Sequence, residues 1–158
     1  MPEPTRGEFT RKFDRDILGD ETAEAEEREA QRLKLQAEDR ELEEEFEKIL
    51  AVLEYRSQWL RSRFPECREL KGSDFRGSRF EFTQGGKLRG WIEFRTRLTD
   101  SQQGIAVESF MELEGSFPRR HDYITFPKEK VVIDRVKRFV EAKLMQFASP
   151  WQDRFAGK

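Results

Sequence analysis

Two neighbouring stretches of alternating apolar and polar residues, joined by a short polar loop, constrain this chain more than any other feature. Residues 91–98 place Ile92, Phe94 and Leu98 on one side, and residues 105–114 continue the alternation from Ile105. A period of two with one apolar side indicates two strands, each with one buried face. The loop between them, residues 99–104, is polar and ends in glycine, as is typical of a hairpin.

A symmetric hairpin about this loop places Leu98 opposite Ile105 and Arg95 opposite Glu108. The two apolar sides then coincide, and opposite charges meet on the other face, where each pair contributes roughly 0.2–1 kcal/mol. A shift of one residue would bury the charges, so we expect a well-specified register. We expect the charged face to be solvated sheet surface; a docking face centred on Trp91 and Phe110 is the alternative.

The stretch before the hairpin predicts one long helix. No proline or glycine occurs between Glu21 and Phe64, and the residues there are good helix formers. Residues 21–41 contain few apolar side chains, so they predict a charged helical extension that partly projects. The second half carries a continuous apolar stripe that must be buried. Its members are Leu42, Phe46, Ile49, Leu50, Leu53, Leu60 and Phe64.

A smaller apolar patch lies on nearly the opposite side of this helix, formed by Val52, Tyr55 and Trp59. We predict that this patch binds another protein or a second copy of the chain, as a homodimer through the long helix; burial within the same chain is the alternative. The leucine spacing also resembles a coiled-coil seam, which Arg32, Asp39 and Arg56 interrupt.

The remaining segments complete the predicted fold. Residues 75–83 and 123–126 predict two further strands, and a final helix is expected to begin at Pro127 and to end at Ser149–Pro150. The order predicts an α+β fold, a four-stranded antiparallel meander with the N- and C-terminal helices packed on one face. One helix on each face is the alternative, and the charges on the outer face of the sheet argue against it.

The predicted domain organisation has four parts. Residues 1–20 form a disordered tail, in which Phe9, Phe13 and Ile17 are spaced to make one helical face on a partner. Residues 21–41 form the charged extension, residues 42–148 the globular domain, and residues 149–158 a C-terminal tail.

The amino-acid composition indicates the cellular compartment and shows how charge is distributed along the chain. Residues 1–50 carry 17 acidic and 9 basic side chains, and the rest carry 15 and 21, giving an acidic front and a basic back. The single cysteine, Cys67, excludes an internal disulfide. No apolar run resembles a secretory signal or a membrane span, so we expect a cytoplasmic protein.

The sequence contains no motif that indicates catalysis. It has no glycine-rich phosphate loop, and one histidine and one cysteine cannot form a standard zinc site within one chain. We therefore expect no enzyme activity, no metal and no cofactor. His121 is expected to be a loop residue, and Cys67 an unreactive thiol.

These observations favour a non-enzymatic protein–protein interaction or adaptor module. Binding of RNA or DNA through the basic globular half is the alternative, because clustered cations neutralise phosphates. The candidate contacts for an anion or a nucleic acid are Arg119, Arg120, His121, Lys128 and Lys130. The charges of the helices and strands are mixed in sign, which weakens this alternative.

Overall fold

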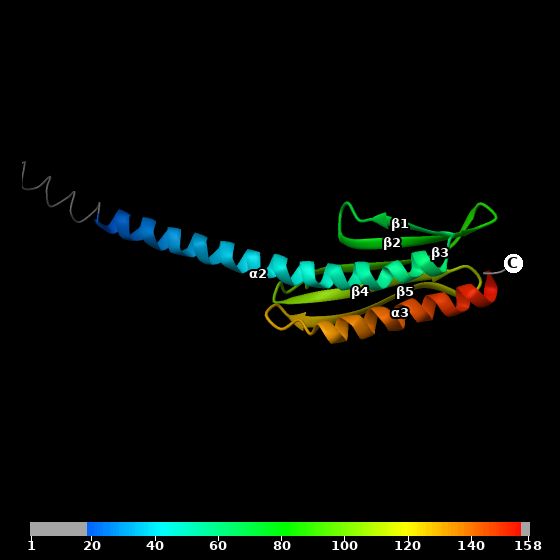
Figure 1. The fold of residues 1–158 in the computed structure, drawn as a ribbon. Helices are drawn as coiled ribbons and strands as arrows, with labels where there is room; N and C mark the ends of the chain where they lie inside the picture. The colour runs from blue at the N-terminus through cyan, green and yellow to red at the C-terminus, as the bar shows by residue number, and fades with distance from the viewer. Residues whose placement is uncertain (1–18, 156–158) are drawn as a thin grey trace, which may run out of the picture. The chain divides into compact units, whose positions relative to one another are not determined.

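The computed structural model describes residues 19–155, with side chains from Thr22 onwards. The elements follow in the order α2 (Gly19–Arg63), β1 (Cys67–Lys71), β2 (Arg76–Gln84), β3 (Lys87–Leu98), β4 (Gly104–Leu113), β5 (Phe117–Pro127) and α3 (Ile133–Arg154). The strands form one antiparallel sheet in the order β1-β2-β3-β4-β5 (Figure 1). The α+β class with an antiparallel sheet is confirmed, and the predicted number of strands, four, is wrong, because residues 19–155 contain five.

The two edge strands differ most from the prediction. β1 was not predicted, and it pairs with β2 by placing Glu69 opposite Phe80. β5 begins at Phe117, so the basic residues predicted to lie in a loop are in a strand. Residues 67–71 and 117–122 show no apolar alternation of their own. They form edge strands because they pair with a neighbouring strand, and such pairing is not visible in the local sequence pattern.

The predicted register of the central hairpin is confirmed. Leu98 lies opposite Ile105, and Arg95 lies opposite Glu108. The ion pairs nevertheless differ from the expected pair of Arg95 with Glu108 across the two strands. Arg95 Nε is 2.6 Å from Glu93 Oε2 of the same strand, and Arg97 Nε is 2.9 Å from Glu108 Oε1. The backbone register therefore does not determine which arginine neutralises which carboxylate.

The described chain divides into two compact units, with the division after Glu41. In the first unit, every side chain of residues 22–41 is exposed, including Leu33 and Leu35. An exposed ion pair joins Arg28 to Glu24 at 3.7 Å, the i,i+4 arrangement that supports a solvated helix. The predicted projection of this stretch and its coiled-coil pairing stay predictions, as does the tail with Phe9, Phe13 and Ile17, which lies outside the described residues.

In the second unit, α2 and α3 share one hydrophobic core with the inward face of the sheet. Most of the predicted stripe of α2 is buried, at Phe46, Ile49, Leu53, Leu60 and Phe64. The sheet contributes its inward side chains, among them Phe82, Phe94, Val107 and Met111, and α3 contributes Val140, Leu144 and Phe147. Within this unit the two helices run beside one another over the sheet (Figure 1), and an ion pair between Arg56 and Glu141 joins them.

The bounds predicted for the last helix are wrong at both ends. Pro127 is the final residue of β5, and its carbonyl accepts a hydrogen bond from Lys130 N–H at 3.0 Å in the turn that follows. Pro150 lies inside α3, which continues to Arg154, so residues 149–154 are helical rather than a tail. Proline removes one helical N–H, and the burial of Trp151 offsets this loss. Trp151 is 1% exposed, and its indole N–H donates to Glu66 Oε1 at 2.9 Å.

Candidate docking groove

The structure divides the predicted partner-binding patch of α2. Val52 is buried in the core, packed among the residues that hold the two helices together. Tyr55 is 70% exposed and Trp59 is 37% exposed. The aromatic pair is therefore the accessible part of the patch, and Val52 is part of the fold.

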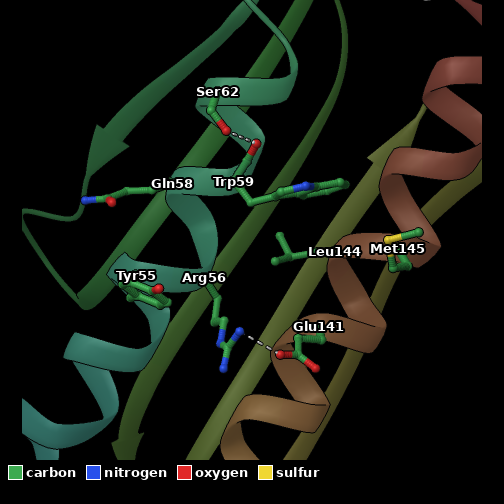
Figure 2. Close-up of a pocket in the computed structure, with 8 residues that line it drawn as sticks. All are labelled: Tyr55, Arg56, Gln58, Trp59, Ser62, Glu141, Leu144 and Met145. Atoms are coloured by element: carbon green, nitrogen blue, oxygen red, sulfur yellow. Dashed lines mark hydrogen bonds and ion pairs between the residues drawn. The ribbon is translucent and has the colours of Figure 1, made fainter.

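Tyr55 and Trp59 line a groove of about 650 Å³ between α2 and α3. Figure 2 shows the Trp59 indole extending from α2 towards α3, with Leu144 and Met145 on the opposite wall. The remaining lining residues are polar: Arg56, Gln58, Ser62 and Glu141. An apolar interior with a polar rim is the usual composition of a protein docking site.

The wall residues are held in place by contacts with the core. The Trp59 ring meets Phe64 edge-on, with centroids 6.1 Å apart at 86°. On the α3 side, Leu144 is buried and lies at the base of the wall, whereas Met145 is 56% exposed. Methionine beside aromatic rings makes an adaptable apolar surface. The groove thus has an indole ring packed on the core on one wall and a flexible methionine side chain on the other.

A second hollow of about 410 Å³ continues the groove towards the start of α3 and shares Tyr55 and Arg56 with it. The ion pair between Arg56 Nη1 and Glu141 Oε1, 3.0 Å long, lies between the two helices there (Figure 2). Lys48 and Lys137 line this second hollow. Within residues 22–155, Lys137 forms no ion pair, so this end of the groove carries an uncompensated positive charge.

The sequence did not indicate the α3 wall of the groove. Glu141 belongs to the polar face of that helix, and Met145 lies outside its apolar stripe. The only available signal was the aromatic pair on α2, since the side-by-side placement of the two helices comes from tertiary packing. A spacing argument within one helix cannot locate a partner wall on another helix.

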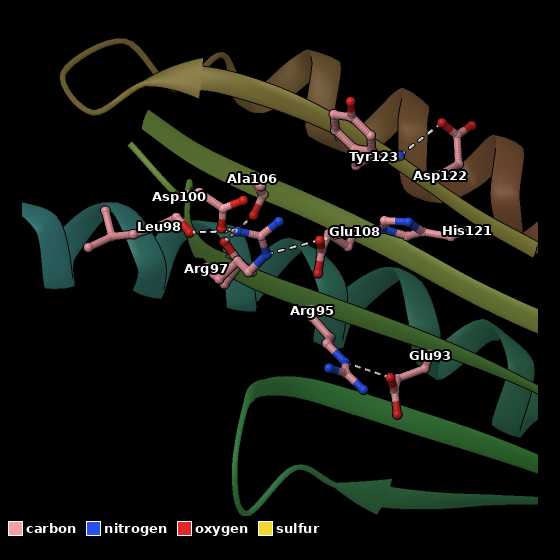
Figure 3. Close-up of polar contacts among 11 residues, drawn as sticks. Glu93, Arg95, Arg97, Leu98, Asp100, Ala106, Glu108, His121, Asp122 and Tyr123 are labelled. Atoms are coloured by element: carbon pink, nitrogen blue, oxygen red, sulfur yellow. Dashed lines mark hydrogen bonds and ion pairs between the residues drawn. The ribbon is translucent and has the colours of Figure 1, made fainter. Parts of the chain in front are cut away.

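The outer face of the sheet, which was expected to be solvated, buries two of its carboxylates. Glu93 and Glu108 are each 4% exposed although no helix covers them. Arg95 and Arg97 neutralise them, as Figure 3 shows, and the arginine side chains themselves form the outer layer. Buried charges require such partners because desolvation alone is costly.

The aromatic residues of this outer face are also covered. The guanidinium groups of Arg95 and Arg119 lie 4.8 and 5.0 Å from the Phe110 ring centroid, and the His121 ring stacks on it at 4.4 Å. Arg79 lies over Trp91 at 4.2 Å. Cation–π contacts of this kind stabilise a sheet face without a third layer. Trp91 and Phe110 are therefore not free rings, as a docking face centred on them would require.

The predicted anion or nucleic-acid contacts are not gathered into one patch. Arg119 and His121 lie on the outer face of β5, while Arg120 pairs opposite Met111 and lies on the other face. Alternate strand residues point to opposite sides, which separates them. The other two predicted contacts, Lys128 and Lys130, follow in the turn after β5.

The described residues contain little else that suggests chemistry. Burial raises the pKa of the Cys67 thiol to about 12, with smaller effects from neighbouring charges, so this thiol stays protonated at neutral pH. Residues 22–155 hold no group of three metal-ligating side chains. In the part of the chain that the structure describes, no helix combines the length and the apolar character needed to cross a bilayer.

Comparisons of the chain with protein-family models, with curated proteins and with solved structures returned no match.

Proposed function

We propose that this protein is a non-enzymatic protein–protein interaction module that docks an amphipathic helix of another protein in the groove between α2 and α3. The observation that carries this proposal is the groove lined by the exposed residues Tyr55, Trp59 and Met145, in which the Trp59 indole extends from α2 towards α3 beside the buried Leu144 (Figure 2). Large aromatic residues in a partly enclosed groove are the side chains that contribute most to binding at protein interfaces.

A helix is the occupant that the groove favours. Two parallel walls formed by helices offer a channel in which a third helix inserts apolar residues at i, i+3 or i+4 spacing. The uncompensated charge of Lys137 at one end favours a partner with acidic residues there. We therefore infer a partner helix with one large apolar stripe and an acidic flank.

The nucleic-acid alternative has less support. On the outer sheet face, Arg79 pairs with Glu81 and Arg97 pairs with Glu108. Arg119 and Arg120, which have no carboxylate partner among residues 22–155, lie on opposite faces of the sheet and so do not form one cationic surface. Phosphate binding needs cations that are free to replace counterions. The protein is therefore expected to pass through an RNA or DNA column at about 50 mM salt, where a phosphate-binding protein is retained.

The partner can be captured at the groove itself. A photo-reactive phenylalanine analogue replaces Tyr55 in the full chain in native cells, and a matched variant carries it at Leu88, which is exposed on β3 and lines neither the groove nor the free edge of β5. We expect a cross-linked protein at position 55 that is absent at position 88, attached through an amphipathic segment with acidic residues. Attachment to a second copy of this chain, or equal products at both positions, would contradict the proposal.

A further inference from the structure

β5 has a long free edge. It pairs with β4 on one side only and spans 11 residues, Phe117–Pro127. Residues 118–123 are all exposed. Figure 3 shows β5 as the last strand on its side of the sheet. Unpaired N–H and C=O groups along such an edge are able to pair with another strand.

The hydrogen bonds of the neighbouring strands establish which residues of β5 direct their backbone to the free edge. Glu114 N–H donates to Arg89 O at 2.8 Å, so the even-numbered residues of β4 turn towards β3 and the odd-numbered ones towards β5. Their partners in β5 are even-numbered, as in the pair Met111 and Arg120. The free edge therefore displays the backbone of Arg119, His121, Tyr123 and Thr125.

Two further observations agree with this assignment. The Tyr123 N–H, which has no strand partner on that side, donates to its neighbour's carboxylate at Asp122 Oδ1, 2.8 Å away (Figure 3). Pro127, which has no N–H, occupies an edge-facing position where none is needed.

The side chains along this edge are charged in a self-complementary order. Arg119 and Arg120 have no carboxylate partner among residues 22–155. Asp122 lies two residues further on and faces the same side of the sheet as Arg120, where it also contacts Lys143 of α3. Tyr123 and Arg119 share the opposite side. Arg120 and Asp122 therefore lie one residue before and one residue after His121, and Arg119 and Tyr123 lie two residues before and two residues after it.

We propose that two copies of this chain pair their β5 strands antiparallel about a twofold axis at His121, joining the two sheets. In this register each Arg120 lies opposite Asp122 of the second copy, and each Arg119 lies opposite Tyr123 of the second copy. A register centred one residue later sets Asp122 against Asp122, and one residue earlier sets Arg120 against Arg120. The charges thus favour one register and one partner, a second copy. This surface is separate from the groove, so the proposal does not depend on the helix-docking function.

A charge exchange tests this pairing in the full chain. Arg120→Asp alone and Asp122→Arg alone each place like charges opposite one another in both halves of the interface, whereas a mixture of the two variants restores both pairs. Sedimentation velocity at micromolar concentrations is expected to give twice the 18.9 kDa chain mass for the wild type and for the mixture. Each variant alone is expected to bind itself at least ~10-fold more weakly.

Arg68→Asp is the matched control, because Arg68 carries the same charge on β1 at the other edge of the sheet. This variant is expected to stay dimeric. If Asp122→Arg alters the circular dichroism spectrum, that variant is set aside. The test then rests on whether Arg120→Asp weakens self-association while Arg68→Asp does not. A monomeric wild type at 100-fold higher concentration, an unaffected Arg120→Asp variant, or a mixture of well-folded variants that stays monomeric would overturn the proposal.

Discussion

Trp59 lies edge-on against Phe64, so the ring that walls the groove rests on the last member of the buried stripe of the same helix. The two residues are five positions apart and have opposite roles. Phe64 belongs to the hydrophobic core, whereas Trp59 turns part of its ring to solvent. The groove is therefore a direct extension of the core packing.

The first prediction separates the groove from the core within one helix. Tyr55→Ala with Trp59→Ala is expected to lower the free energy of unfolding by less than about 2 kcal/mol, because Tyr55 is mostly in water and Trp59 is only partly buried. Val52→Asp is expected to cost more than about 3 kcal/mol, because it buries a charge without a partner. Urea denaturation followed by circular dichroism measures both. Equal losses would show that the aromatic pair is structural.

The second prediction concerns the end of α3, which holds the fold together rather than fraying. Trp151→Ala removes a fully buried indole packed against Phe82, with centroids 5.1 Å apart, and is expected to cost about 3–5 kcal/mol. Met145→Ala, six residues earlier on the exposed side, is expected to cost less than about 1 kcal/mol. A Trp151→Ala variant with the denaturation midpoint of the wild type would refute this role.

The third prediction concerns pH. The hydrogen bond from Lys143 holds the pKa of the Asp122 carboxyl below its ordinary value near 3.8, against an opposing effect of partial burial. A lowered folded pKa contributes stability that is present above the unfolded pKa and is lost as pH falls through the folded pKa. Lys143→Met is expected to return the pKa of Asp122 to its usual range, as followed by carboxyl NMR titration. An unchanged pKa in this variant would assign the effect to another neighbour.

The fourth prediction concerns the single thiol. With its pKa raised to about 12 by burial, Cys67 carries ~10³-fold less thiolate at pH 8 than the unfolded chain, whose thiol pKa is near 9.0. A thiol-specific disulfide reagent is therefore expected to react slowly with the native protein and rapidly in urea. Similar rates in the two conditions would mean that the thiol is accessible and ionised in the fold.

The parts of the fold that were predicted correctly are those in which the local pattern and the tertiary environment agree. The register of Leu98 and Ile105 follows from an alternation present in both strands, and the core stripe of α2 follows from helical spacing. The same reasoning missed β1 and found only residues 123–126 of β5, because the pattern around Arg119 and Arg120 predicts a loop and these residues form a strand only through pairing with β4. Pro127 and Pro150 are helix boundaries in the usual pattern, but Pro127 ends β5 instead. At Pro150, burial of Trp151 outweighs that preference and α3 continues.

The candidate site was predicted only in part for the same reason. Tyr55 and Trp59 stood out because they form an apolar group on the far side of a helix whose other face is buried. Leu144 and Met145 did not, since their proximity to that group arises from the packing of α3 beside α2. Val52 was grouped with the aromatic residues by its angle on the helix, yet it is buried as part of the hydrophobic core.

The most direct test of helix docking is the affinity of the segment captured at position 55, measured by calorimetric titration as a synthetic peptide. Trp59→Ala is expected to weaken its binding at least ~30-fold, as for a central interface residue. Trp91→Ala removes a matched indole from the outer face of the sheet, where Arg79 covers it, and is expected to leave the affinity unchanged. Equal affinities for wild type and Trp59→Ala would contradict docking in the groove between α2 and α3.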